Sequence, residues 1–126
     1  MNMAKEEMKI LLFEENSADA ELICKYLELS NLKYELMRVR RLADGLLLMK
    51  EQAIDLILLD LPLLDSPEIT TLKVVTAAVR DEAIIVLTDT VDRQLSEEAL
   101  QGVVQDYLSK DRLTEDVLRR SILNAI

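Results

Sequence analysis

The chain has 126 residues, with 24 acidic and 15 basic side chains and a formal net charge of -9. Half of its residues are hydrophobic, so a chain of this length can bury one core, and we expect a single domain over residues 1–126. The chain has no histidine, which excludes Ser/His and Cys/His catalytic pairs and histidine-ligated zinc. The acid excess argues against nucleic-acid binding, because affinity for phosphate backbones needs a basic face.

The chain shows no signal for export or membrane insertion. The single cysteine, Cys24, cannot form an internal disulfide, which favours a reducing, cytoplasmic compartment. Lys5, Glu6 and Glu7 lie where a signal peptide would need an apolar run. The longest apolar stretch, Ala83–Leu87, has five residues, far fewer than the ~20 that cross a bilayer. We therefore expect a cytoplasmic protein that contacts no membrane.

Short apolar runs alternate along the chain with segments whose apolar residues recur every three to four positions. The runs predict strands at Lys9–Phe13, Tyr34–Val39, Asp55–Leu59, Ala83–Leu87 and Val103–Leu108. The intervening periodic segments predict helices, marked by Ala20 to Leu27, Leu42 to Met49, Ile69 to Val79, Leu95 to Leu100 and Leu113 to Ile126. This alternation indicates a doubly wound, three-layer α/β fold, with a five-stranded parallel sheet covered by helices on both faces.

Local signals refine this fold. The runs at 55–59 and 83–87 lack a polar alternation, which predicts central strands covered on both sides. Asn16 or Ser17 can cap the first helix, and Asp111 or Thr114 can open the last one. Ser66, followed by Pro67 at the first helical position, is expected to start the third helix.

Polar residues follow four of the five apolar runs, where a doubly wound fold places its site. They are Glu14 and Glu15, Asp60, Thr88, and Ser109 with Lys110. Three converging carboxylates repel one another unless they share a proton or hold a divalent cation such as Mg²⁺, Mn²⁺ or Ca²⁺. An ammonium and a hydroxyl beside them suit a phosphoryl group, so the constellation indicates phosphoryl transfer. Taken singly, each residue is equally well explained as a solvated loop charge.

Four segments carry a resemblance to a known family. They are ILLFEENSADAE at 10–21, DLILLDL at 55–61, IIVLT at 84–88 and QDYLSK at 105–110. Their order and spacing resemble the receiver domain of two-component response regulators, over nearly the whole chain. The resemblance implies a flavodoxin-like (βα)5 sandwich with strand order 2-1-3-4-5.

The resemblance also implies a role for each site residue. Asp60 would accept a phosphoryl group from a sensor histidine kinase or phosphotransfer protein, and Lys110 would pair with that group. Mg²⁺ would be held by Glu14, Glu15, Asp60 and the backbone carbonyl of Pro62.

Signalling is implied for two further positions. Thr88 would bind the phosphoryl group, and its shift would let Tyr107 change rotamer and signal to a downstream effector protein or a fused output domain. A domain of this kind is a signalling module rather than an enzyme.

Several residues depart from the family pattern. Glu15 stands where the family usually has Asp, Asp89 follows Thr88 where Ala or Gly is usual, and Leu64 and Glu68 replace Pro and Gly. Glu15 and Asp89 support an alternative, a pseudo-receiver that binds a protein partner without phosphorylation.

Two other functional classes lack the residues that they require. An Asp-x-Asp phosphatase needs an acid where Pro62 stands, and a P-loop needs glycines where residues 14–17 stand.

The apolar cluster at 46–49 exceeds what one helix face buries, so this helix is either a homodimer interface or deeply sunk between its neighbours.

Overall fold

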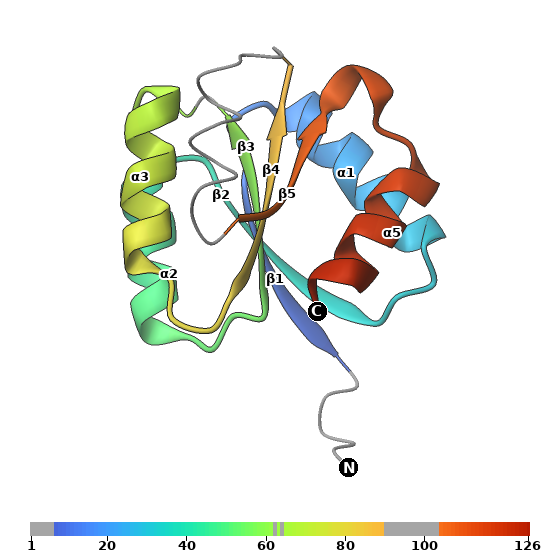
Figure 1. Ribbon diagram of the computed structural model, residues 1–126, viewed down its shortest axis with the longest axis horizontal. Coiled ribbons are helices and arrows are strands. Elements are labelled where there is room, and N and C mark those ends of the chain that lie inside the picture. Colours follow the sequence, from blue (N-terminus) through green and yellow to red (C-terminus); the bar gives the residue numbers. More distant parts are fainter. Residues whose placement is uncertain (1–6, 62, 64, 90–103) are drawn as a thin grey trace.

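Five strands form one parallel sheet, and helices cover both of its faces (Figure 1). The computed structural model describes residues 7–61, 63, 65–89 and 104–126. The strands are β1 (Met8–Phe13), β2 (Tyr34–Val39), β3 (Leu56–Leu61), β4 (Ala83–Thr88) and β5 (Val104–Ser109), in the order β2-β1-β3-β4-β5. The predicted fold class and strand order are therefore confirmed.

The described helices form the two outer layers. They are α1 (Ser17–Leu29), α2 (Leu42–Glu51), α3 (Glu68–Ala78) and α5 (Glu115–Ala125), with a short 3-10 turn, η2 (Lys110–Arg112), after β5. Helices α2 and α3 lie on one face of the sheet, and α1 and α5 lie on the other (Figure 1). No helix in the described ranges is long and apolar enough to cross a membrane.

Each face of the sheet carries its own apolar core. All six residues of β3 and all six of β4 are buried, as expected for central strands. Successive side chains of a strand point to opposite faces, so Ile57 and Leu59 pack toward α2 and α3, whereas Leu56 and Leu58 pack toward α1 and α5. This alternation places the next residue of β3, Asp60, on the side of α1.

Two helices start at caps provided by neighbouring side chains. Asn16 Oδ1 accepts from the Asp19 N–H (2.9 Å) to start α1, and Thr114 Oγ1 accepts from the Val117 N–H (3.1 Å) to start α5. The prediction that Pro67 takes the first helical position is wrong. Its ψ of 158° is extended, so Pro67 is itself the residue before α3, which begins at Glu68.

Helix α2 is held against the sheet and is capped from a distant loop. Its preceding residue, Arg41, provides no side-chain cap, and Asp65 accepts from the N–H groups of Leu42 (2.8 Å) and Ala43 (3.3 Å) instead. Three members of the 46–49 cluster pack into the core facing α3, and Leu47 alone is exposed. The sunken position therefore accounts for this cluster, and a homodimer stays a prediction.

One predicted helix and the start of one predicted strand cannot be compared with the structure. The helix predicted at Leu95 to Leu100 and the strand start at Val103 lie outside the described residues. The third and fourth strands extend further than predicted, so Asp60 and Thr88 are strand residues rather than the first loop residues.

Candidate functional site

Two buried carboxylates lie side by side at the carboxyl ends of the central strands. Phe13 of β1 is paired with Leu59 of β3, so the next residues along, Glu14 and Asp60, are neighbours. Asp60 is 1% exposed and Glu14 is 2% exposed. Parallel pairing therefore brings two acids that are 46 positions apart into one buried site.

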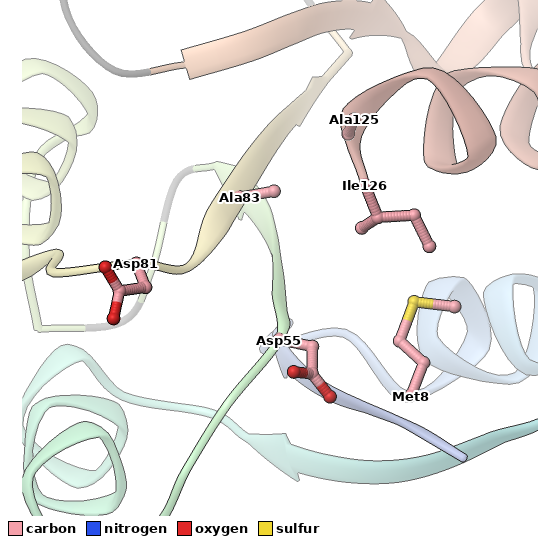
Figure 2. A pocket seen from close by; sticks show the side chains of 6 residues that line it. All are labelled: Met8, Asp55, Asp81, Ala83, Ala125 and Ile126. Carbon is pink, nitrogen blue, oxygen red and sulfur yellow. The ribbon is translucent and has the colours of Figure 1, made fainter. Parts of the chain in front are cut away.

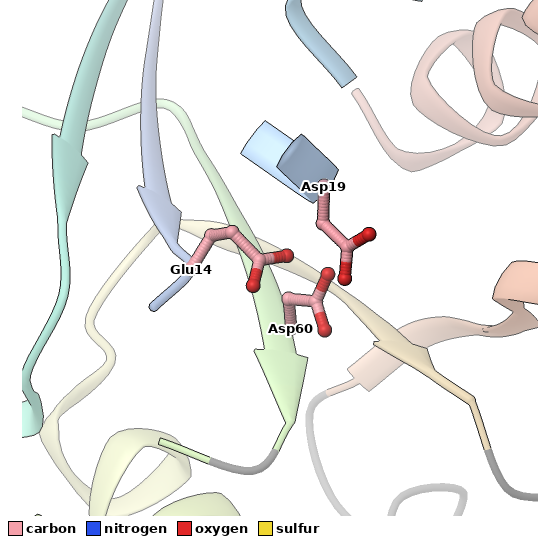
Figure 3. A group of neighbouring side chains, drawn as sticks. All are labelled: Glu14, Asp19 and Asp60. Carbon is pink, nitrogen blue, oxygen red and sulfur yellow. The ribbon is translucent and has the colours of Figure 1, made fainter. Parts of the chain in front are cut away.

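Helix α1 contributes a third carboxylate. Glu14, Asp19 and Asp60 each offer an oxygen, and these oxygens all lie within 4.8 Å of one another. Figure 3 shows the three side chains pointing toward a common centre, from the end of β1, the first turn of α1 and the end of β3. Asp19 had no role in the sequence prediction, where it was only part of the matching segment 10–21.

Lys110, at the start of η2, inserts its ammonium among these acids. Its Nζ lies 2.6 Å from Asp60 Oδ1, 3.0 Å from Asp19 Oδ2 and 3.6 Å from Asp89 Oδ2. The Lys110 side chain is 13% exposed, whereas that of Asp89 is 69% exposed. The contact with Asp60 is therefore the shielded one, whereas the Asp19 side chain is 39% exposed and Asp89 approaches from the solvent side.

The surroundings shift the pKa values of Asp60 and Lys110. Burial raises the pKa of Asp60 to about 9, and the adjacent Glu14 carboxylate acts in the same direction, against Lys110. Burial by itself would lower the pKa of Lys110, but the hydrogen bond and charge of Asp60 raise it. The site thus holds a firmly charged lysine beside a carboxyl group that resists ionisation.

The donor set fits a hard divalent cation. Glu14 Oε2 accepts from the Asn16 N–H at 3.0 Å, and Asp60 Oδ1 contacts Lys110. The second oxygen of each group, Glu14 Oε1 and Asp60 Oδ2, is buried and has no hydrogen-bond partner among the described residues. Such buried oxygens are costly unless something binds them, and carboxylate oxygens are the ligands that Mg²⁺ prefers.

Of the two other predicted ligands, only Glu15 lies in the described part of the chain. Glu15 is half-buried, and in the described part of the chain it does not join the cluster of Glu14, Asp19 and Asp60. Pro62, whose carbonyl was the fourth predicted ligand, lies outside the described residues. The sequence prediction therefore identified two of the three acids that converge.

The predicted switch residues lie on the other side of the sheet. Thr88 ends β4 and is buried, and its hydroxyl donates to Glu68 Oε2 at 3.5 Å, at the start of α3. Tyr107 of β5 is half-buried and packs against the core that faces α2 and α3. Val86 of β4 is paired with Tyr107, so the two switch positions lie on adjacent strands. The contact with Glu68 was not foreseen.

A separate pocket opens at the opposite end of the sheet. It has a volume of about 420 Å³ and is lined by Met8, Asp55, Asp81, Ala83, Ala125 and Ile126 (Figure 2). Asp55 Oδ2 already accepts from the Lys9 N–H at 2.8 Å. None of the six lining residues is basic, so this pocket lacks the cationic side chain that would bind a phosphoryl group.

Residues 10–122 match the family model described as the response regulator receiver domain. No curated protein matches the sequence. Solved structures do match, over most of the chain. A response regulator receiver domain protein from Clostridium thermocellum is 25% identical, with a TM-score of 0.80 and 94% of each chain covered.

Two further structures show the same fold. The signal receiver domain of an HD domain-containing protein from Pseudomonas fluorescens Pf-5 has a TM-score of 0.83 at 22% identity, with 94% of each chain covered. The receiver domain of a sensor histidine kinase from Pseudomonas aeruginosa PAO1 has a TM-score of 0.78 at 24% identity, covering 94% of this chain and 97% of that one. That structure has a magnesium ion coordinated in its active site cleft.

Proposed function

Because this chain belongs to the response regulator receiver domain family, we propose that it accepts a phosphoryl group on Asp60 from a phosphohistidine of a partner protein. The partner is a sensor histidine kinase or a phosphotransfer protein, since the chain has no histidine to phosphorylate. The observation that carries the proposal is the 2.6 Å contact of Lys110 with a buried aspartate beside two further acids.

The transfer uses one oxygen of Asp60 as the nucleophile. That oxygen attacks phosphorus, an O–P bond forms, and the N–P bond of the phosphohistidine breaks. The electron pair of the broken bond returns to the imidazole nitrogen, and Asp60 becomes an acyl phosphate. Asp60 needs one oxygen for this bond and the other for the cation: Oδ1 lies beside the Lys110 ammonium, and Oδ2 has no hydrogen-bond partner among the described residues.

Charge stabilisation comes from the surrounding residues. Lys110 is held within reach of Asp60 and can follow a phosphoryl oxygen as negative charge is added there. Glu14, Asp19 and Asp60 would hold Mg²⁺, with Glu15 and the Pro62 carbonyl as the remaining predicted ligands. When bound, Mg²⁺ offsets the charge of the carboxylates and of the phosphoryl oxygens.

Signalling is proposed to pass through Thr88 and Tyr107. Phosphoryl oxygens on Asp60 would draw the Thr88 hydroxyl away from Glu68, and the vacated space would let Tyr107 change rotamer. A downstream effector protein or a fused output domain would detect this change. The cytoplasmic location predicted from the lone Cys24, and the absence of nucleic-acid binding by this acidic domain, belong to the same proposal.

A second candidate, the pseudo-receiver, is favoured by one observation. Asp89 places a carboxylate 3.6 Å from the Lys110 ammonium, where it competes with an incoming phosphoryl group. In that case the domain would bind a protein partner without any covalent change.

Intact-protein mass spectrometry after incubation with phosphoramidate and Mg²⁺ separates the two candidates. We expect the mass of one phosphoryl group on the wild-type chain and on Asp81→Asn, an exposed acid at the far end of the sheet. Asp60→Asn should gain no mass. A wild-type chain that stays unmodified would favour the pseudo-receiver.

A further inference from the structure

We propose that Asp19, rather than Glu15, supplies the carboxylate that completes the cation site with Glu14 and Asp60. The inference rests on the proposed function for the presence of a cation. It assigns the role of the usual second acid to a residue in the first turn of α1.

The position of Asp19 is the first support. Its carboxylate lies within 4.8 Å of ligand oxygens of both Glu14 and Asp60, and Glu15 joins no such group in the described ranges. Two buried oxygens in this cluster, Glu14 Oε1 and Asp60 Oδ2, have no hydrogen-bond partner among the described residues. The acids therefore surround a centre that needs a positive ligand (Figure 3).

The segment that carries Asp19 is fixed by hydrogen bonds to the same site. The Asn16 N–H donates to Glu14 Oε2 at 3.0 Å, and the Asn16 side chain accepts from the Asp19 N–H at 2.9 Å. One residue, Asn16, thus connects the Glu14 carboxylate to the first turn of α1. This connection holds two of the acids in register with each other before any cation binds.

Asp19 also differs from its two partners in exposure. Its side chain is 39% exposed, whereas Glu14 and Asp60 are almost completely buried. A cation needs a path from solvent, and the half-exposed ligand gives it one. The charges agree with this role, because the three carboxylates, when ionised, carry three negative charges against the single positive charge of Lys110.

Metal titration of matched variants tests the assignment. Mn²⁺ binding is followed by electron paramagnetic resonance and Mg²⁺ binding by calorimetry, on the wild-type chain, Asp19→Asn and Glu15→Gln. We expect Asp19→Asn to weaken binding by at least about 10-fold and Glu15→Gln by less than about 2-fold. Asp19→Asn should fold normally, because the cap of α1 uses the backbone N–H of residue 19; thermal unfolding followed by circular dichroism checks this.

The outcomes distinguish this inference from the proposed function. A larger loss in Glu15→Gln than in Asp19→Asn, equal losses, or no binding by the wild-type chain would overturn the role of Asp19. Phosphorylation of Asp60 in such a chain would leave the proposed function standing. Conversely, the expected metal pattern without any phosphorylation would support Asp19 and refute the phosphoacceptor role of Asp60.

Discussion

Removing the charge of Glu14 should stabilise the cation-free protein. The Glu14 and Asp60 carboxylates are both buried, and each has one oxygen without a partner among the described residues. In Glu14→Gln the amide oxygen can still accept from the Asn16 N–H, and the amide nitrogen can donate to Asp60. A repulsion between two acids is thereby replaced by a hydrogen bond.

The magnitude follows from the separation of the two groups. The facing oxygens of the two groups lie no more than 4.8 Å apart, and unit charges at that distance repel by about 3.5 kcal/mol at an effective dielectric constant of about 20. A proton taken up by Asp60, whose pKa is raised by burial, limits how much of this repulsion the wild-type chain carries. We therefore expect Glu14→Gln to gain about 1–3 kcal/mol in free energy of unfolding. Divided by a typical m-value, this gain in free energy corresponds to a rise of about 1 M in the urea midpoint of unfolding.

Urea unfolding followed by circular dichroism, in EDTA and in MgCl₂, measures this effect. The exposed Glu35→Gln serves as the control and should change the free energy of unfolding by less than about 0.5 kcal/mol. Mg²⁺ should stabilise the wild-type chain more than Glu14→Gln, so that the difference between them shrinks. A midpoint in EDTA that falls in Glu14→Gln, as it does when an ordinary buried hydrogen bond is lost, would refute the repulsion argument.

Three further substitutions probe the scaffold and the approach to the site. A Cβ at residue 45 would overlap the buried Phe13 ring, so Gly45→Ala should lose about 1–3 kcal/mol in urea unfolding, and an unchanged midpoint would show that the ring can move aside. Two backbone N–H groups at the start of α2 lower the pKa of Asp65, so its stabilisation is present above the ordinary aspartate pKa and is lost as the pH falls through the lowered one. Asp65→Ala should therefore lose about 0.5–1 kcal/mol at pH 7 and less as the pH falls through the lowered pKa of Asp65, and a loss that does not change with pH would contradict a charged cap. Asp89 is largely exposed, so Asp89→Ala should speed phosphorylation by phosphoramidate about 2–5-fold, and a slower rate would show that Asp89 assists.

The fold was predictable because each apolar run is short, unbroken and followed by a helical period. The runs around Ile57 and Ile85 predicted the two fully buried strands, and burial on both faces leaves little freedom in where such strands can lie. The polar residues that end these runs then had to meet at one edge of the sheet. Asp60, Glu14 and Lys110 were found in this way.

The third acid was not predictable from its neighbours in the chain. Glu14 and Glu15 are consecutive, and successive side chains of an extended segment point in opposite directions, so only one of them readily faces Asp60. Asp19 reaches the site because Asn16 caps α1, and this cap sets the direction in which the first turn of the helix points. The spacing of residues along the chain does not predict that direction. Acids are also common in first helical turns because they interact favourably with the helix dipole. The position of Asp19 in such a turn therefore did not distinguish it as a site residue.

Tertiary contacts decided two other features. Asp65 caps α2 from a loop 22 and 23 positions away, and no local pattern around Arg41 signals such a partner. The carboxylate of Glu68 accepts the Thr88 hydroxyl across 20 positions, which depends on how α3 packs beside β4. Both contacts join segments that only the folded sheet brings together.

The site of modification is the most direct test of the central claim. The chain is treated with phosphoramidate in MgCl₂ or in EDTA, acyl phosphates are reduced with borohydride, and the reduced residue is located by peptide mass spectrometry. We predict reduction at Asp60 alone, dependent on Mg²⁺. Reduction at another carboxylate, or none at Asp60 in MgCl₂, would contradict the assignment of Asp60 as the phosphoacceptor.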